Sequence, residues 1–163
     1  MRLILAIGLA LALAACSGRK PAAAEAADVK AAQAFMAANA KQPGVVTLPS
    51  GLEYRIVTSG PAGGPHPRLS DEVKVNYEGK LVSGKVFDSS FERGEPADFP
   101  LEGLVQGWVE ALQLMRPGDE WILWVPPSLG YGDEDKGPIP ANSVLIFRIQ
   151  LLGVLQHPAG AMG

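Results

Sequence analysis

Apolar and polar residues alternate most strictly over residues 71–81, where Val73 and Val75 fall on one side and Lys74 and Asn76 on the other. Strict alternation predicts a β-strand with one buried face and one wet face. Shorter runs rich in apolar residues predict further strands over residues 52–57, 86–87, 120–125 and 143–152. The pattern therefore favours a body built mainly of short strands.

The two tryptophans of the 120–125 strand, Trp121 and Trp124, are three residues apart and so lie on opposite faces. We therefore expect both sides of this strand to be at least partly covered. Two further aromatic residues, Tyr54 and Phe99, are interpreted together with Trp124 as core residues, because large aromatic side chains are usually buried.

Helical spacing appears in two places. Residues 104–114 carry one strongly apolar stripe, formed by Leu104, Val105, Trp108, Val109 and Leu112. A second short helix is predicted over residues 28–40, with Asp28 as its N-terminal cap and Pro43-Gly44 as its stop. Its Phe35 and Met36 are interpreted as packing against the domain, in preference to a dimer contact.

These elements define the predicted fold class. One sheet with short antiparallel connections and one short helix give an α+β domain, in which a curved antiparallel β-sheet wraps around the helix and a short N-terminal helix precedes it. A single short helix cannot cover so many apolar strand residues unless the sheet curves. The concavity left at the helix end is the expected place for a site.

Composition narrows the possible functions. The chain has 163 residues, 47% of them hydrophobic, with a net charge of −3, which fits one domain with extensions. No basic run is present, so nucleic acid is not an expected partner. His66 and His157 lie far apart and there is a single cysteine, so neither a metal site nor a cofactor is expected.

The N-terminus predicts export. A cationic start, an apolar stretch over residues 3–13 and small residues before Cys16 describe a signal segment of residues 1–15, too short to span a bilayer. The ending Leu13-Ala14-Ala15-Cys16 resembles the bacterial lipobox, which implies lipid attachment to Cys16 and membrane anchoring. An ordinary signal peptide with an incidental cysteine is the alternative. Ser17 then implies sorting to the outer membrane, facing the periplasm.

The remaining organisation follows from these segments. Residues 16–43 are expected to form a tether (residues 17–27) and the short helix, residues 44–154 the folded domain, and residues 155–163 a flexible tail.

Several short motifs occur in one order across the predicted domain: Val75-Asn76-Tyr77-Glu78-Gly79, Phe87-Asp88-Ser89-Ser90, Arg93-Gly94-Glu95-Pro96, Val105 with Gly107-Trp108, Tyr131-Gly132, Ile139-Pro140 and Phe147. Each is weak alone. In this order the set resembles the FKBP-type peptidyl-prolyl cis-trans isomerases over residues 44–154. The segment from Asn39 to Leu52 is similar to the one that precedes the domain in bacterial envelope members.

The resemblance implies an isomerase of X-Pro bonds in envelope proteins, with proline-containing polypeptides as substrates. Trp108 would form the floor under the proline ring, and Tyr77, Phe87 and Phe147 the walls, beside Leu104, Val105 and Ile139. The Tyr131 hydroxyl would donate to a peptide carbonyl. Asp88 would lie near Tyr77 and Arg93, with Arg93 counted among the substrate-binding residues.

The implied chemistry agrees with the residues available. Rotation about X-Pro exchanges no proton with the protein, so no nucleophile or general base is needed, and a dry cavity that disfavours the planar amide suffices. Two alternatives stay open: a binding module or holdase that uses the same groove without turnover, and a structural envelope lipoprotein. A monomer is expected because the N-terminal helix is short.

Macrolides such as tacrolimus or rapamycin are further implied ligands. Ala97 and Pro138 depart from the residues that many family members carry, so the wall beside Ala97 is expected to be more open.

Overall fold

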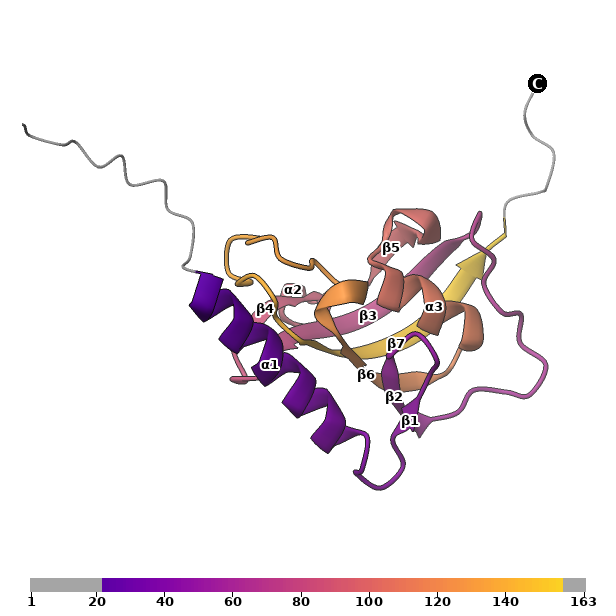
Figure 1. Ribbon diagram of the computed structural model, residues 1–163. Coiled ribbons are helices and arrows are strands. Elements are labelled where there is room, and N and C mark those ends of the chain that lie inside the picture. The colour runs from indigo at the N-terminus through magenta and orange to yellow at the C-terminus, as the bar shows by residue number, and fades with distance from the viewer. Residues whose placement is uncertain (1–21, 157–163) are drawn as a thin grey trace, which may run out of the picture.

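The computed structural model describes residues 22–156 (Figure 1). The predicted signal segment, Cys16, residues 17–21 of the tether and the tail from His157 lie outside this range. Within the described part, no helix combines the length and the apolar character that crossing a bilayer requires.

Seven antiparallel strands form one sheet in the order β1-β2-β6-β7-β3-β4, and β5 pairs with β3 beyond this path. The strands are β1 (Val46–Thr47), β2 (Glu53–Thr58), β3 (Glu72–Leu81), β4 (Val86–Ser89), β5 (Ala97–Pro100), β6 (Glu120–Val125) and β7 (Leu145–Leu155). Together with the short helix on its face, this sheet confirms the predicted α+β class.

β3 is the strand on which the site is built. It pairs with β7 along one side. On the other side, its first half pairs with β5 and its second half with β4. The alternation read from the sequence is confirmed, because Val73, Val75 and Tyr77 are buried and Lys74 is exposed.

One face of the sheet packs against α3 (Gln106–Leu114). The residues that α3 buries are Gly107, Trp108, Val109, Ala111 and Leu112. Gly107 is required at this contact, since a Cβ there would stand 2.7 Å from a methyl carbon of Val125 on β6. The helix can therefore approach the sheet closely enough to seal the core.

The opposite face of the sheet is covered by α1 (Ala22–Asn39). Ala32 and Met36 of α1 pack against Trp124 and Val144, with Phe35 alongside. The two tryptophans of β6 indeed serve opposite faces, since Trp121 belongs to the core under α3 and Trp124 to the contact with α1. Packing of Phe35 and Met36 against the domain is confirmed.

The N-terminal helix is longer than predicted. Residues 22–27, expected to be tether, form its first turns and bring its length to 18 residues. The cap expected at Asp28 is wrong, because the alanines before it carry almost no side-chain entropy cost in a helix and let it start earlier.

Three other predicted boundaries change. Leu104 and Val105 are extended residues before α3, not part of it, and a 3-10 turn over Leu101–Gly103 precedes them. β7 runs to Leu155, past the expected end at 152 and the domain boundary at 154, because Leu155 pairs with the start of β3. β5 was not predicted. Short elements complete the fold: α2 (Ser90–Arg93) and a second 3-10 turn over Pro127–Leu129.

Candidate active site

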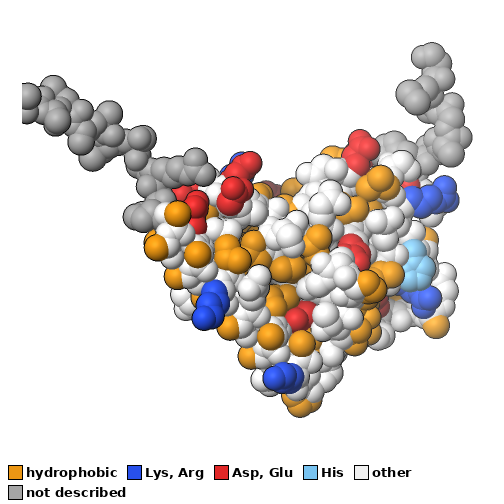
Figure 2. Space-filling view, in the orientation of Figure 1, with side chains coloured by type: hydrophobic (Ala, Val, Ile, Leu, Met, Phe, Trp, Pro, Cys, Tyr) orange, Lys and Arg blue, Asp and Glu red, His pale blue; other side chains and the backbone are white. Residues whose placement is uncertain are grey.

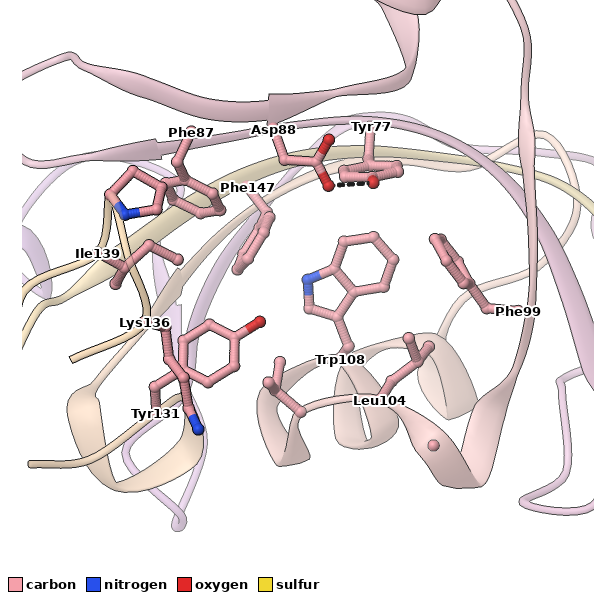
Figure 3. A pocket seen from close by; sticks show the side chains of 13 residues that line it. Tyr77, Phe87, Asp88, Phe99, Leu104, Trp108, Tyr131, Lys136, Ile139 and Phe147 are labelled. Atoms are coloured by element: carbon pink, nitrogen blue, oxygen red, sulfur yellow. Dashed lines mark hydrogen bonds between the residues drawn. The ribbon is translucent and has the colours of Figure 1, made fainter. Parts of the chain in front are cut away.

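A cavity of about 490 Å³ opens at the N-terminal end of α3. Figure 3 shows it from close by, with side chains from β3, β4, β5, β7 and the loop before β7 converging on Trp108. Its lining is mostly aromatic and aliphatic: Tyr77, Phe87, Asp88, Phe99, Gly103, Leu104, Val105, Trp108, Tyr131, Lys136, Pro138, Ile139 and Phe147. The structure thus gathers nine of the ten residues that the sequence predicted for catalysis and substrate binding.

Trp108 lies at the centre of this cluster. Its ring meets the rings of Tyr77 and Phe147 edge to face, each with centroids 5.2 Å apart. The side chain is 4% exposed, and its indole N–H has no hydrogen-bond partner among the described residues. This nitrogen is itself buried, and Figure 3 shows it on the side of the ring that faces Tyr131.

Phe87 and Phe147 form a second aromatic pair, with centroids 5.7 Å apart and nearly perpendicular planes. Both rings lie against the backbone of Gly79 in β3, where an added Cβ would stand 2.6 Å from Phe87 and 2.7 Å from Phe147. No ordinary side chain fits in that space. Gly79 therefore sets how deep the two rings sit.

Asp88 is held by two neighbours. The hydroxyl of Tyr77 donates to one carboxylate oxygen of Asp88, and the Arg93 guanidinium pairs with the other. Arg93 also donates to the Tyr77 hydroxyl oxygen at 3.0 Å, and its guanidinium stacks over the Tyr77 ring. Arg93 is not among the residues that line the cavity; it contacts Asp88 and Tyr77, and its contact with substrate stays a prediction.

The electrostatics of this trio favour a charged Asp88. Burial opposes its ionisation most strongly, but the hydrogen bonds from Tyr77 and Arg93 together outweigh burial and hold the pKa of Asp88 below its ordinary value. For Tyr77, burial and the hydrogen bond to Asp88 raise the pKa above its ordinary value. The trio therefore carries one fixed negative charge at the cavity wall, compensated by Arg93, and Tyr77 keeps its proton.

The rim of the cavity comes from two loops. Leu104 and Val105 stand just before α3, and the Val105 carbonyl accepts the amides of Trp108 and Val109. On the other side, Ile139 is buried and Tyr131 is 36% exposed. Figure 3 shows the Tyr131 hydroxyl directed across the cavity toward Trp108. An oxygen of a bound peptide could be reached from this side.

The lining contains no serine, cysteine or histidine, so it offers no nucleophile paired with a base. Between residues 22 and 156, no three His, Cys, Asp or Glu side chains lie close enough together to hold a metal ion. What the described cavity does offer is shape, a dry aromatic wall and a few oriented hydrogen-bond donors.

Comparison with known proteins decides the family. Residues 63–152 match the family described as FKBP-type peptidyl-prolyl cis-trans isomerase, and residues 10–56 match the domain amino-terminal to it. The chain belongs to the FKBP-type isomerase family. It is 48% identical, over 78% of its length, to the peptidyl-prolyl cis-trans isomerase Mip of Coxiella burnetii, of which it covers 55%. It is likewise 48% identical, over 74% of its length, to the outer membrane protein MIP of Legionella longbeachae, of which it covers 52%.

Solved structures of FKBP-type proteins share the fold. The chain resembles FkpA from Escherichia coli with a TM-score of 0.78 at 40% identity, covering 83% of this chain and 63% of that one. It resembles an isomerase from Pseudomonas syringae with a TM-score of 0.76 at 37% identity, covering 85% of this chain and 98% of that one. The chain spans just over half of the Mip proteins of Coxiella and Legionella.

Four lining residues of this FKBP-type cavity were not predicted as site residues: Phe99, Gly103, Lys136 and Pro138. Phe99 was interpreted as core alone, yet it is half-buried and faces Tyr77 and Trp108 at the cavity. Ala97 lies on the same face of β5 and is not among the lining residues, so the open wall beside it stays a prediction. Alternation along β5, which places Ala97 and Phe99 on one face, is the sequence signal for this position. Tyr54 and Trp124 pack in the core as predicted.

Proposed function

We propose that this protein catalyses cis–trans isomerisation of X-Pro peptide bonds. The observation that carries the proposal is the aromatic cavity floored by Trp108, in a chain of the FKBP-type family. The cavity has the size of a small-ligand pocket and can take a proline ring with its flanking amide groups. Its lining holds no serine, cysteine or histidine, and isomerisation needs neither a nucleophile nor a proton transfer.

The reaction is limited by amide resonance. Partial double-bond character makes the X-Pro bond planar and sets a barrier of about 20 kcal/mol. The planar amide is more charge-separated than the twisted one, so transfer into an apolar cavity disfavours the ground state more than the transition state. Each 1.36 kcal/mol of such difference is worth about a tenfold acceleration.

Each site residue then takes a role in the proposal. Trp108 supports the proline ring, while Tyr77, Phe87 and Phe147 exclude water around the twisting bond. The Tyr131 hydroxyl and the Val105 amide hold the flanking carbonyls, and Leu104 and Ile139 line the residues on either side of proline. Asp88, kept charged by Tyr77 and Arg93, faces the polar groups of the twisted amide.

The test is isomerisation of a proline tetrapeptide by the full chain. We expect acceleration by the wild type and a loss of at least tenfold in kcat/KM for Phe147→Ala, since removing that ring opens the cavity to water. If wild type and variant both match buffer, the protein does not catalyse this reaction. Binding of the peptide without turnover would instead support the non-catalytic chaperone module. Tacrolimus is expected to compete for the same cavity.

We further propose that the protein works in the cell envelope, anchored by lipid at Cys16 to the outer membrane and facing the periplasm. The lipobox-like segment before Cys16 supports this, and a relative from Legionella longbeachae is named an outer membrane protein. Expression with radiolabelled palmitate should label the wild type and not Cys16→Ser. Equal recovery of both proteins in the soluble fraction would refute the anchor.

A monomer is proposed as the working state. Helix α1 uses its apolar residues Ala32 and Met36 on its own sheet, which leaves them unavailable to a partner. Sedimentation at twice the chain mass of 17.1 kDa would contradict this.

A further inference from the structure

A second cavity, of about 540 Å³, lies between α1, the β1–β2 hairpin and the loop that follows β6. Its walls are hydrophobic side chains of α1 and the two consecutive prolines after β6, and its edge carries uncharged hydrogen-bonding groups. The lining consists of Val29, Ala32, Gln33, Met36, Thr47, Ser50, Gly51, Glu53, Pro126, Pro127, Ser128, Gly132 and Asn142. In Figure 2, hydrophobic side chains predominate on this face beside α1, and charged ones are sparse. We call this cavity the helix groove.

Glu53 is the one ionisable residue among those lining the helix groove, and it is only 2% exposed. One carboxylate oxygen, Oε2, accepts a hydrogen bond of 2.7 Å from the Asn39 side chain at the end of α1. No hydrogen bond from the described residues reaches the other oxygen. Burial raises the pKa of Glu53, against the smaller effect of Asn39. A buried carboxylate with a free acceptor is the group that a cation in the groove would satisfy.

The helix groove adjoins the active-site cavity. Tyr131 lines the active site and the next residue, Gly132, lines the groove, so one Cα step of about 3.8 Å separates the two linings along the chain. The backbone N–H of Asn142 donates to the Gly132 carbonyl at 2.7 Å, and this bond joins the two ends of the loop. The two cavities therefore share this loop as a common wall.

We propose that the helix groove is a second subsite for the substrate polypeptide, which binds an extended apolar segment flanking the proline and pairs a Lys or Arg side chain of that segment with Glu53. This inference rests on the proposed function and names the class of its substrates. Val29, Pro126 and Pro127 take the apolar side chains of that segment. Gln33, Ser128 and Asn142 offer hydrogen bonds to the extended backbone.

The experiment compares a proline tetrapeptide with 12-residue peptides that contain the same X-Pro bond. Four to six residues from the proline, on either side, the long peptides carry Leu-Lys-Leu, Leu-Gln-Leu or Leu-Glu-Leu. At this spacing an extended chain spans about 13–20 Å, enough to cross a loop. The full chain is assayed with each peptide, and kcat/KM is the readout.

Substitutions of Gln33 place a negative or a positive charge beside the groove. The position is exposed on α1, and both Glu and Lys are compatible with a helix there. In the wild type we expect the Lys peptide to exceed the Glu peptide about five- to tenfold in kcat/KM, the effect of one charge-assisted hydrogen bond. Gln33→Glu should widen this ratio, while Gln33→Lys and Glu53→Gln should bring it near one. The matched control Gln113→Lys, an exposed position of α3 outside both cavities, should leave the ratio unchanged.

Turnover of the tetrapeptide should be the same in all these variants. A wild-type ratio near one, or equal effects of Gln33→Lys and Gln113→Lys, would overturn the subsite. So would a tetrapeptide rate that falls with Gln33→Lys, since the groove would then act on the loop and not on the substrate. If the wild type has twice the chain mass in solution and Gln33→Lys restores the single mass, the groove binds a second copy of the chain. Absence of tetrapeptide turnover in the wild type would instead defeat the proposed function itself.

Discussion

Replacing Gly79 by alanine tests whether the depth of the aromatic wall controls both stability and activity. The new Cβ would lie 2.6 Å from Phe87 and 2.7 Å from Phe147, about 0.8 Å inside ordinary contact distance. β3 is held by β7 along its length and by β4 at this point, so the backbone has little freedom to retreat. The two rings must therefore move into the cavity.

Overpacking of this kind in a closed core destabilises a domain by about 1–3 kcal/mol. A displacement of about 1 Å at the reacting groups can lower a rate about a hundredfold. We expect Gly79→Ala to lower the free energy of unfolding by about 2 kcal/mol and to reduce kcat/KM for a proline tetrapeptide by about ten- to a hundredfold. Urea titration followed by tryptophan fluorescence gives the first quantity, and exchange NMR of the peptide gives the second.

The control is Gly153→Ala on the neighbouring strand β7, where the nearest atom to an added Cβ is 4.0 Å away. It makes the same chemical change without the clash and should leave kcat/KM within twofold of wild type. If Gly79→Ala behaves like Gly153→Ala in both measurements, the close contact between β3 and the two rings does not control the site.

Four further outcomes are expected. Glu53→Gln should raise the urea midpoint at pH 7, because burial raises the pKa of Glu53 and its charged form destabilises the fold. This gain should vanish at pH 4, where the wild-type carboxyl is protonated. For Asp88, whose pKa is lowered, activity should hold through neutral pH and fall only below about pH 4. Arg93→Gln should move that acid limb of the kcat/KM profile to higher pH, and an unmoved limb would contradict the pairing with Asp88. Met36→Ala, which empties the contact between α1 and Trp124, should lower the free energy of unfolding by about 2 kcal/mol in urea titrations without changing tetrapeptide kcat/KM.

Much of the fold was predictable because one face of β3 is dry and the other wet, and because Trp121 and Trp124 must point apart. The boundaries that failed depended on competing signals. Asp28 is a good cap, but the alanines before it are equally good helix residues. β5 was hidden because Pro96 and Pro100 bracket three residues, a pattern that indicates a loop, although proline is tolerated in strands at a sheet edge.

The site was predictable as a set of residues and not as a shape. Ordered motifs identified Tyr77, Asp88 and Trp108, since each motif places one wall residue. The motif glycine Gly79 was noted without its function, because its contact with Phe87 and Phe147 arises only when β4 and β7 flank β3. The helix groove depends in the same way on α1 crossing the sheet, which no local pattern specifies.

The central claim is that a dry aromatic cavity floored by Trp108 accelerates rotation about an X-Pro bond without proton transfer. Exchange NMR of a proline tetrapeptide with the full chain, run in H₂O and in D₂O, tests it most directly. We expect catalysed exchange with nearly equal rates in the two solvents and loss of that exchange in Phe147→Ala. Exchange no faster than in buffer, or a rate more than about twofold slower in D₂O, would contradict it.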